Sequence, residues 1–476
     1  MKHQISFKEK RKNCYSLEFE NKEIEVLVYL SEKLLKEFGE EESLIQLINA
    51  SKLKGVISPV IGMPDIHTGF GLPIGGVLAT DYNNGIVSAG AVGYDINCGV
   101  RVLNTKIHSS NLDKEKLRKI LLEITKRVPL GVGKESPYKE LRKIDIEGIA
   151  YSGVKYVINM GFGREADLEK IESNGNIICD NVNVLNKEEI ERADQLGTLG
   201  GGNHFIEIGK IEKVYDKYIA DRLGLAEDYI YILIHTGSRG FGHQIATDYS
   251  KIMWNNSEKN KTPAPVKGLA CAPIHSKDGE DYLNAMAIAA NYAFANREII
   301  THLVREAFVK VFKDSEEKIG LNLVYDVAHN IAKKEMYNNR MMLIHRKGAT
   351  RALPAGNKEI PAIYRDIGQP AIIPGSMGTA SYIVIGTEQI KETFNSVNHG
   401  AGRTMSRTQA FKNLTTDDLL KQTKDIVLIA DNLKKIIDEA PSAYKNIDEV
   451  VWTLVDAGLT KPIVRFIPMA VLKGEE

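Results

Sequence analysis

Three apolar runs rich in β-branched residues each lie next to a histidine and a small-residue loop in the sequence. This repeated pattern constrains the fold most strongly. The runs are TLGGGNHFIEI around His204, YIYILIHTGSRGFG around His235 and LNLVYDVAHN around His329. β-Branched residues favour strands, and glycine-rich stretches beside them favour tight loops. The pattern therefore predicts three separate strand ends that each present one imidazole.

A carboxylate and a thiol stand three residues apart in the short polar segment GYDINCGV, at Asp95 and Cys98. A single turn could direct both side chains at one cation, and the three histidines would complete the ligand set. Thiolate, carboxylate and imidazole suit a borderline divalent cation, and ligand softness alone favours zinc. The sulfur of Cys98 has lone pairs for two ions. A histidine taken alone is more often a core or loop residue, so we interpret His67 and His243 as structural or as lying behind the ligands.

Two small-residue loops in the C-terminal third could bind phosphate. They are PGSMGTASYIV from Pro374 and NHGAGRTMSR from Asn398, and glycine lets backbone N–H groups approach phosphate oxygens closely. The second loop adds His399 as a candidate nucleophile and Arg403 and Arg407 as guanidinium forks. From these residues alone, a turn with solvated arginines is an equally good interpretation.

The sequence lacks two common nucleotide-binding motifs. It has no GxxxxGK(S/T) loop, which argues against a P-loop NTPase, and no KxDG motif of the lysine-adenylating enzymes. A covalent nucleotidyl intermediate would therefore need another nucleophile, for which His399 is the candidate.

The net charge gives no sign of a polyanionic partner. Lys+Arg and Asp+Glu both number 62, so the formal net charge is zero and nucleic acid would have to bind through a local basic patch. Candidates for that patch stand near the motifs: Arg239, Arg346, Lys347, Arg351, Lys461, Arg465 and Lys473.

The chain shows no repeat and no linker rich in Pro, Ser or Gly, so we expect a single domain over residues 1–476. Glycine-dense residues 55–101 predict short strands joined by tight turns, and helices are expected at about 113–150 and 282–313. Strands and helices alternate too irregularly for a doubly wound sheet or a barrel, which favours an α+β fold with mixed β-sheets and surrounding helices. Four scattered cysteines predict a reducing, cytoplasmic location. The lack of a signal peptide or an apolar span predicts a soluble protein that does not bind membranes. We also expect a monomer.

The motifs together resemble the RtcB family of RNA-splicing ligases. The resemblance rests, in order along nearly the whole chain, on GMPDIHTGFGLPIGG, GYDINCGVR, GTLGGGNHFIEI, HTGSRGFGHQ, YDVAHN, HRKGATRALP, PGSMGTASY, HGAGRTMSR and the terminal VLKG. It implies an RtcB-type fold and a ligase that joins RNA ending in a 3′-phosphate or 2′,3′-cyclic phosphate to RNA beginning with a 5′-hydroxyl. GTP would be the cosubstrate, and the role would be tRNA splicing, RNA repair or both. Some family members work with archease.

The resemblance also assigns roles to residues. It implies two Mn²⁺ ions bridged by Cys98, with Asp95 and His204 on the first ion and His235 and His329 on the second. His399 would form a histidine–GMP intermediate, from which GMP passes to the RNA 3′-phosphate before the 5′-hydroxyl displaces it. The implied nucleotide-binding residues are Asn203, His204, Phe205, Ile206, Glu207, His329, Asn330, Pro374, Gly375, Ser376, Met377, Ser381, His399, Gly400, Ala401, Gly402 and Lys473.

Within that set, the resemblance suits Glu207 and Lys473 to reading guanine, and Tyr444 would stack nearby. Asp65, Arg239 and Arg403 are expected around the RNA phosphate or the metal ions. Two rival interpretations stay open. One is a metal-dependent cyclic phosphodiesterase or phosphoesterase without nucleotidyl transfer, and the other is an RNA-binding protein with a structural metal and no enzymatic activity.

Overall fold

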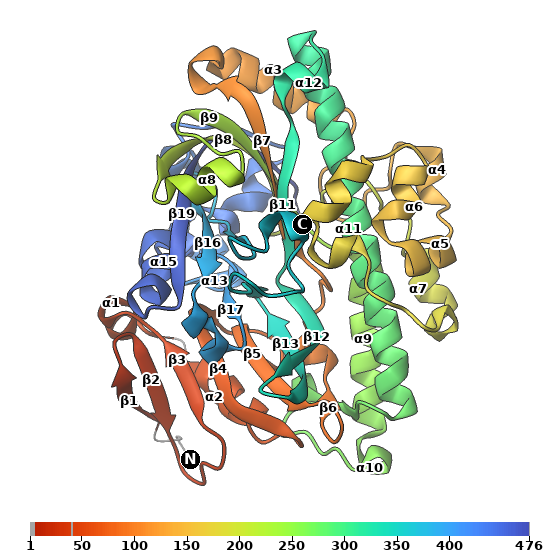
Figure 1. Ribbon diagram of the computed structural model, residues 1–476, viewed down its shortest axis with the longest axis vertical. Coiled ribbons are helices and arrows are strands. Elements are labelled where there is room, and N and C mark those ends of the chain that lie inside the picture. The colour runs from red at the N-terminus through yellow and green to blue at the C-terminus, as the bar shows by residue number, and fades with distance from the viewer. Residues whose placement is uncertain (1–4, 40, 476) are drawn as a thin grey trace.

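The computed structural model describes residues 5–39 and 41–475, and two large sheets organise them (Figure 1). The first sheet has the strand order β1-β2-β3-β4-β5-β13-β12. All its neighbours are antiparallel except β3 and β4. Its strands are β1 (Ser6–Arg11), β2 (Cys14–Glu18), β3 (Val26–Tyr29), β4 (Val56–His67), β5 (Ile74–Asp81), β12 (Asn330–Tyr337) and β13 (Arg340–Lys347).

The second sheet has the order β11-β7-β9-β8-β19-β16-β15, and β18 (Val427–Ala430) pairs in parallel with β19. Its other strands are β7 (Gly99–His108), β8 (Phe205–Val214), β9 (Tyr229–Thr236), β11 (Asn322–Ala328), β15 (Ala371–Ile373), β16 (Ser381–Gly386) and β19 (Thr460–Lys473). Short ladders join β6 (Ile86–Val87) to β10 (Ala272–Pro273) and β14 (Ala349–Arg351) to β17 (Ser396–Asn398). Sheets that mix parallel and antiparallel pairs, with helices around them, confirm the α+β prediction.

One long helix, α11 (Lys277–Phe312), runs along the molecule beside the second sheet (Figure 1). The Ser276 side chain caps its first turn, and it ends where Lys313 takes a left-handed conformation. Its alanine-rich middle is buried on all sides, because small side chains let neighbouring elements approach closely. The helix predicted at about 282–313 is therefore confirmed, with a start five residues earlier than expected.

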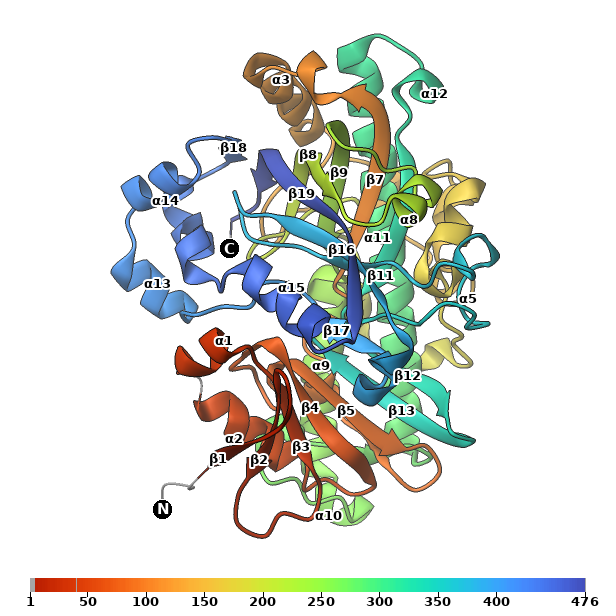
Figure 2. The same ribbon diagram turned by 60° about the vertical axis from the view of Figure 1, so that its left-hand side comes forward.

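The remaining helices flank the sheets (Figures 1 and 2). α9 (Arg239–Asn255), α3 (Lys114–Thr125), α5 (Ile146–Ser152) and α6 (Val154–Asn159) pack on α11. The others are α1 (Glu32–Lys36), α2 (Glu41–Ala50), α4 (Lys139–Arg142), α7 (Lys187–Glu191), α8 (Lys217–Arg222), α10 (Ser257–Asn260), α12 (Glu316–Ile319), α13 (Arg407–Asn413), α14 (Thr416–Gln422) and α15 (Ile447–Asp456). Among the described residues, no helix is both long and apolar enough to cross a membrane.

The glycine-dense segment 55–101 matches its prediction in part. It contains turns and the two-residue strand β6, as expected, but also the 12-residue strand β4 and the 8-residue strand β5. Several of its glycines lie inside strands, where neighbouring side chains leave no room. A Cβ on Gly62 would lie 2.7 Å from Ile66 Cδ1 and 2.9 Å from Leu47 Cδ1. Close packing, rather than chain reversal, explains those glycines.

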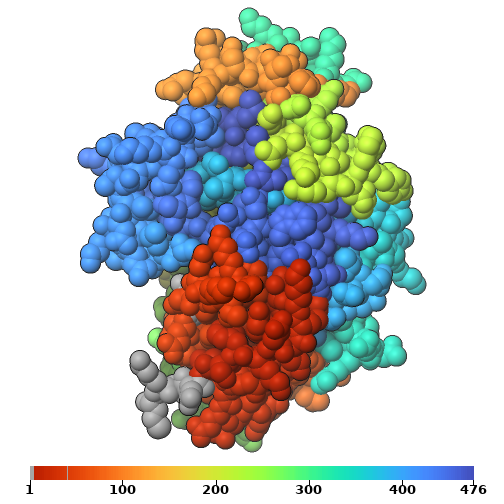
Figure 3. All heavy atoms as spheres, turned by 90° about the vertical axis from the view of Figure 1, so that its left-hand side faces the viewer, coloured from red at the N-terminus to blue at the C-terminus, as the bar shows by residue number. Residues whose placement is uncertain are grey.

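The N-terminal sheet and the C-terminal third of the chain are in direct contact, as the space-filling view shows (Figure 3). Lys445 Nζ donates hydrogen bonds to the carbonyls of Pro64 (3.2 Å) and Ile66 (2.6 Å) in β4. The Ser31 hydroxyl beside α1 donates to Glu449 in α15. Lys445 also donates its backbone N–H to the Gly402 carbonyl at 2.9 Å, so it links the end of β4 to the loop that contains His399.

Candidate active site

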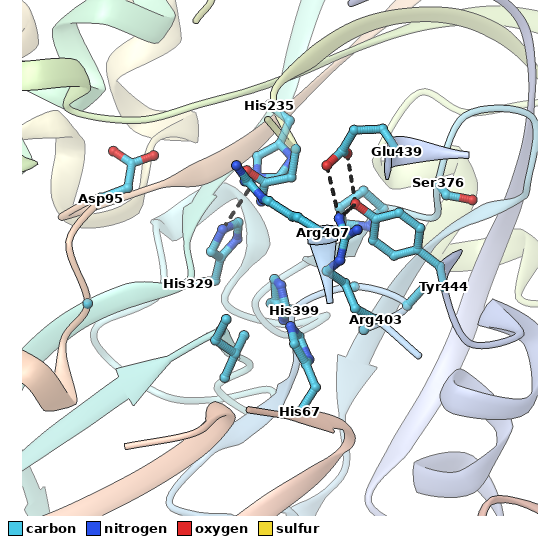
Figure 4. Close-up of a pocket in the computed structure, with 18 of the residues that line it drawn as sticks. His67, Asp95, His235, His329, Ser376, His399, Arg403, Arg407, Glu439 and Tyr444 are labelled. Carbon is cyan, nitrogen blue, oxygen red and sulfur yellow. Dashed lines mark hydrogen bonds and ion pairs between the residues drawn. The ribbon is translucent and has the colours of Figure 1, made fainter. Parts of the chain in front are cut away.

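A cavity of about 800 Å³ is lined by residues of both sheets and of the two C-terminal small-residue loops. His67, at the end of β4, and Lys347, at the end of β13, belong to the first sheet. His235 and Lys473 belong to the second. Figure 4 shows His235, His329 and His399 converging on this cavity, with Arg403, Glu439 and Tyr444 on another wall. The cavity therefore joins most of the motifs that the sequence singled out.

The five predicted ligands meet at one end of the cavity. Cys98 Sγ lies 3.4 Å from His204 Nε2 and 3.3 Å from His235 Nε2. His235 Nε2 lies 3.4 Å from His329 Nε2, and His204 Nε2 lies 2.8 Å from Asp95 Oδ2. The donor atoms form two groups that could each hold a metal ion, Asp95–Cys98–His204 and Cys98–His235–His329, with each group's atoms within 4.8 Å of one another. Cys98 belongs to both groups.

Strand register produces this convergence. Gly99, which follows Cys98, pairs with Thr236 of β9 on one side and with Ala328 of β11 on the other. His235 and His329 are the chain neighbours of those two partners, so they flank Cys98. Phe205 pairs with His235, which brings His204 to the same edge. His204 precedes its strand instead of ending it, but it reaches the same site.

Burial sets the protonation of the ligands. It lowers the pKa of His204, and it lowers the pKa values of His235 and His329 well below the ordinary value, so the three imidazoles are neutral. Burial alone would raise the pKa of Asp95, but its hydrogen bond with His204 and the positive charge of Arg239 hold it below its usual range. Burial also raises the pKa of the Cys98 thiol well above its usual value. A divalent cation that binds this sulfur must displace its proton. Neutral imidazoles, a carboxylate and a thiol that can be deprotonated fit such a cation.

His399 is oriented by a buried carboxylate. Asp65 Oδ2 lies 2.6 Å from His399 Nδ1 and accepts hydrogen bonds from the backbone N–H groups of His399 (3.0 Å) and Gly400 (3.2 Å). A neutral ring with this partner carries its proton on Nδ1 and keeps a lone pair on Nε2, on the other side of the ring. The His399 ring centroid is 5.0 Å from that of the ligand His329. The predicted nucleophile His399 therefore lies beside the predicted ligand cluster.

Comparison with known proteins settles the family. The family model described as tRNA-splicing ligase RtcB matches residues 46–474. The chain belongs to the RtcB family. It is 44% identical over 462 residues to the tRNA-splicing ligase RtcB of Pyrobaculum aerophilum, with 95% of each chain covered. It is 43% identical to the protein of that name from Archaeoglobus fulgidus and 42% identical to that from Thermococcus kodakarensis, with 94% of each chain covered in both comparisons.

Most residues that the RtcB resemblance assigned to nucleotide binding line the cavity. The lining members of that set are Asn203, Phe205, His329, Asn330, Pro374, Gly375, Ser376, Met377, His399, Gly400, Ala401, Gly402 and Lys473. Ser381 supports the lining from behind, because its hydroxyl accepts a hydrogen bond from the Gly375 N–H at 3.0 Å. His204 contributes to the ligand cluster, as described above. Arg403 also lines the cavity.

Two other members of the RtcB set point elsewhere. Ile206 packs in the hydrophobic core. Glu207 accepts a hydrogen bond from the Tyr231 hydroxyl, and burial raises its pKa to about 8. Neither residue is part of the cavity wall. The guanine-reading role expected for Glu207 would require its side chain to leave Tyr231.

Arg239 lies behind the predicted metal ligands, in contact with His204. Its Nη1 is 3.2 Å from His204 Nδ1, which also lies 3.2 Å from the Leu199 carbonyl. Gly200 makes room for this arginine, because a Cβ there would lie within 2.1–2.3 Å of the guanidinium atoms. Arg239 therefore contacts a ligand of the predicted metal centre rather than the open cavity.

Glu439, which no sequence motif had marked, anchors one wall of the cavity. Its carboxylate accepts hydrogen bonds from Arg403 Nη1 (3.0 Å), the Tyr444 hydroxyl (2.7 Å) and Lys473 Nζ (3.0 Å). Burial alone would raise its pKa, but Lys473 and Arg403 lower it to about 2, so Glu439 is ionised. One carboxylate and two cations leave this cluster with a net positive charge. No local sequence pattern marks Glu439, since its partners come from distant segments.

Lys347 is a further basic residue on the cavity wall. Its ammonium group donates to the carbonyls of Phe70 and Gly90, and burial lowers its pKa to about 7. A bound phosphate would favour its protonated form. The sequence placed Lys347 only in a general basic patch.

Proposed function

We propose that this chain is an RNA ligase that joins RNA 3′-phosphate or 2′,3′-cyclic phosphate ends to 5′-hydroxyl ends, with GTP as cosubstrate and two Mn²⁺ ions. Its role would be tRNA splicing, RNA repair or both. The observation that carries the proposal is the pairing of His399 with Asp65 beside the two ligand groups in one cavity. Membership of the RtcB family supports the same activity.

In the first step, His399 Nε2 attacks the α-phosphorus of GTP. A P–N bond forms, the bond from the α-phosphorus to the bridging oxygen breaks, and pyrophosphate leaves. Asp65 holds the Nδ1 proton throughout, so the positive charge that develops on the ring faces a buried carboxylate. Bound Mn²⁺ would supply positive charge for the phosphate oxygens. Arg403, Lys473 and Lys347 add cationic charge from the cavity walls.

In the second step, an oxygen of the RNA 3′-phosphate attacks the phosphorus of histidine–GMP. A P–O bond forms, the P–N bond breaks, and the electron pair returns to His399 Nε2. In the third step, the 5′-hydroxyl attacks the activated RNA phosphorus and expels GMP, and its proton passes to solvent. A cyclic phosphate must first be hydrolysed to a 3′-phosphate at the same site. Each step uses one cavity, which fits the single convergence of ligands, nucleophile and cations.

The two ligand groups suggest how the ions would be held. Asp95, Cys98 and His204 would bind the first, and Cys98, His235 and His329 the second. Manganese instead of zinc follows from the family resemblance, because the donor types also suit zinc. Nucleotide contacts would come from the cavity-lining members of the set named above, to which we add Glu439.

Labelled GTP tests the proposal. Wild-type protein incubated with α-labelled GTP and Mn²⁺ should become labelled, with a bond that is acid-labile and alkali-stable. His399→Ala should stay unlabelled, whereas the control His108→Ala, which changes an exposed histidine bonded to Ser110, should label normally. An unlabelled wild type that still hydrolyses cyclic phosphate would favour the phosphodiesterase, and label on His399→Ala would reject this nucleophile. Ligation with and without added archease tests the need for that partner.

A further inference from the structure

The helix α11 contains several buried polar residues, and two of them, Asn296 and Arg297, bond segments close to the predicted metal ligands. Asn291, Asn296, Arg297, Glu298 and Thr301 are all fully buried on this helix. Burial of so many polar groups is costly unless each is paired. Their hydrogen-bond partners therefore show which segments of the chain these residues hold in place.

Arg297 connects two of the ligand-bearing segments. Its Nη1 donates to the carbonyl oxygens of Asn97 at 2.8 Å and of Thr236 at 3.0 Å. Asn97 immediately precedes the ligand Cys98, and Thr236 immediately follows the ligand His235. One guanidinium nitrogen thus holds the backbone beside Cys98 and His235, which belong to the same predicted ligand group.

The other side of the same guanidinium holds the third segment. Arg297 Nε lies 3.0 Å from both carboxylate oxygens of Asp326, and Nη2 lies 2.9 Å from Oδ1. Asp326 belongs to β11, three residues before His329. Arg101 of β7 also binds Asp326, with Nε and Nη2 both 2.8 Å from Oδ2. The carboxylate is therefore fixed from two directions.

Asn296 extends this clamp to the fourth ligand. Its Nδ2 donates to the carbonyls of Thr198 (3.2 Å) and Gly237 (3.3 Å), and its Oδ1 accepts from the Gly197 N–H at 2.8 Å. The 197–199 loop ends at Leu199, whose carbonyl contacts His204 Nδ1. α11 thus contacts the backbone next to Cys98 and His235, and it reaches His204 through the 197–199 loop and His329 through Asp326.

We infer that Arg297 is a positioning residue that sets the spacing of Cys98, His235 and His329, and hence the affinity with which these three residues bind a metal ion. A planar guanidinium can bond two carbonyls and a carboxylate at once, whereas an ammonium cannot reproduce that fork. Ligands held in place need little reorganisation when a cation binds, and loss of such outer contacts typically lowers metal affinity about 10- to 100-fold. The inference rests on the proposed metal centre.

Arg305 provides a matched control on the same helix. It is equally buried, binds Asp167 through Nη1 (2.6 Å) and Nη2 (3.0 Å), and donates from Nε to the Leu321 carbonyl at 3.0 Å. None of these partners adjoins a ligand in the sequence. Arg305→Lys therefore disturbs a buried ion pair of α11 without releasing a ligand segment.

The test measures Mn²⁺ binding to the full chain by the loss of the free Mn²⁺ signal in electron paramagnetic resonance, together with melting temperatures with and without Mn²⁺. Arg297→Lys should weaken binding of one of two Mn²⁺ equivalents about 10- to 100-fold and shrink the Mn²⁺-induced rise in melting temperature. Arg305→Lys should lower the metal-free melting temperature and keep wild-type affinity.

Wild-type affinity in Arg297→Lys would overturn the inference, as would an equal loss in Arg305→Lys, because that loss would reflect general destabilisation. If Arg297→Lys does not fold, Asp326→Asn is measured in the same way. It retains the side-chain volume, and it should weaken one equivalent about 3- to 10-fold, since the amide loses charge assistance; unchanged affinity there overturns the inference. Failure of the wild type to bind Mn²⁺ would instead refute the proposed metal centre.

Discussion

Asp65→Asn isolates the contribution of one buried carboxylate to the nucleophile. Asp65 Oδ2 has three partners, at 2.6 Å (His399 Nδ1), 3.0 Å (His399 N) and 3.2 Å (Gly400 N). An amide oxygen in the same place could accept all three hydrogen bonds but would carry no charge. The loop that holds His399 should therefore keep its conformation, while the interaction with the ring weakens.

The expected size of the effect follows from the bond to Nδ1. Positive charge grows on the imidazole as Nε2 attacks phosphorus, so this bond is stronger in the transition state than in the ground state. Hydrogen bonds to charged groups contribute about 1.5–3 kcal/mol and those between neutral groups about 0.5–1.5 kcal/mol. The amide should therefore lose about 1–1.5 kcal/mol of this stabilisation, which corresponds to a roughly 5- to 13-fold slower guanylylation, since about 1.4 kcal/mol is tenfold. The affinity for GTP should change little, because Asp65 lies behind the ring.

The assay is the single-turnover rate of protein labelling by α-labelled GTP at saturating GTP and Mn²⁺. Asp167→Asn is the control, because it also neutralises a buried carboxylate, the partner of Arg305, at a distance from the cavity. It should label at the wild-type rate even if its melting temperature falls. A wild-type labelling rate for Asp65→Asn would refute the orienting role, and an equal loss in Asp167→Asn would attribute the effect to stability.

Three further outcomes are expected. Cys98→Ala should lose both Mn²⁺ equivalents and ligation, because one sulfur belongs to both ligand groups; two retained equivalents in a metal titration would contradict bridging. Glu439→Gln should raise the KM for GTP roughly tenfold by releasing Arg403 and Lys473 from a charged acceptor, and an unchanged KM would show that this wall does not contact the nucleotide. Burial raises the pKa of Glu207 to about 8, from about 4.3 in the unfolded chain. Between these two pH values the folded protein holds a proton on Glu207 that the unfolded chain has lost. The free energy of unfolding should therefore fall as pH rises, by at most about 1.4 kcal/mol per pH unit. Glu207→Gln cannot take up this proton, so its melting temperature relative to that of the wild type should rise between pH 5 and pH 8. Parallel pH profiles of the two melting temperatures would contradict the raised pKa of Glu207.

The ligand cluster could be predicted because its information is local. Each histidine stands beside an apolar strand, and Asp95 and Cys98 share one turn, so residue type and context indicated a common site. The sequence could not supply the register. Pairing of Gly99 with Thr236 and with Ala328 decides that His235 and His329 flank Cys98, and such pairing depends on the whole sheet.

The charged cluster around Glu439 could not be predicted for the same reason. Glu439 ends a short 3-10 helix, and Lys473 ends β19; only the tertiary fold makes them partners at 3.0 Å. The glycines of 55–101 show the converse difficulty. Their abundance suggested turns, but glycine at a close packing contact and glycine at a turn are identical in the sequence. Glu207 lies on the same face of β8 as the cavity-lining Phe205 but two residues further along the strand, where it meets Tyr231 of β9; the sequence could not show where along β8 the cavity ends.

His329 has a position that links the two halves of the site. It follows β11 of the second sheet and precedes β12 of the first, so the chain passes from one sheet to the other at this residue. Its carbonyl accepts a hydrogen bond from the Ala349 N–H at 3.1 Å, where β14 begins. β14 pairs with β17, in register from Ala349–Asn398 to Arg351–Ser396, and His399 follows directly. The predicted ligand His329 and the proposed nucleophile His399 are therefore connected through one carbonyl and one short ladder, while Asp65 of β4 holds the His399 ring from the first sheet.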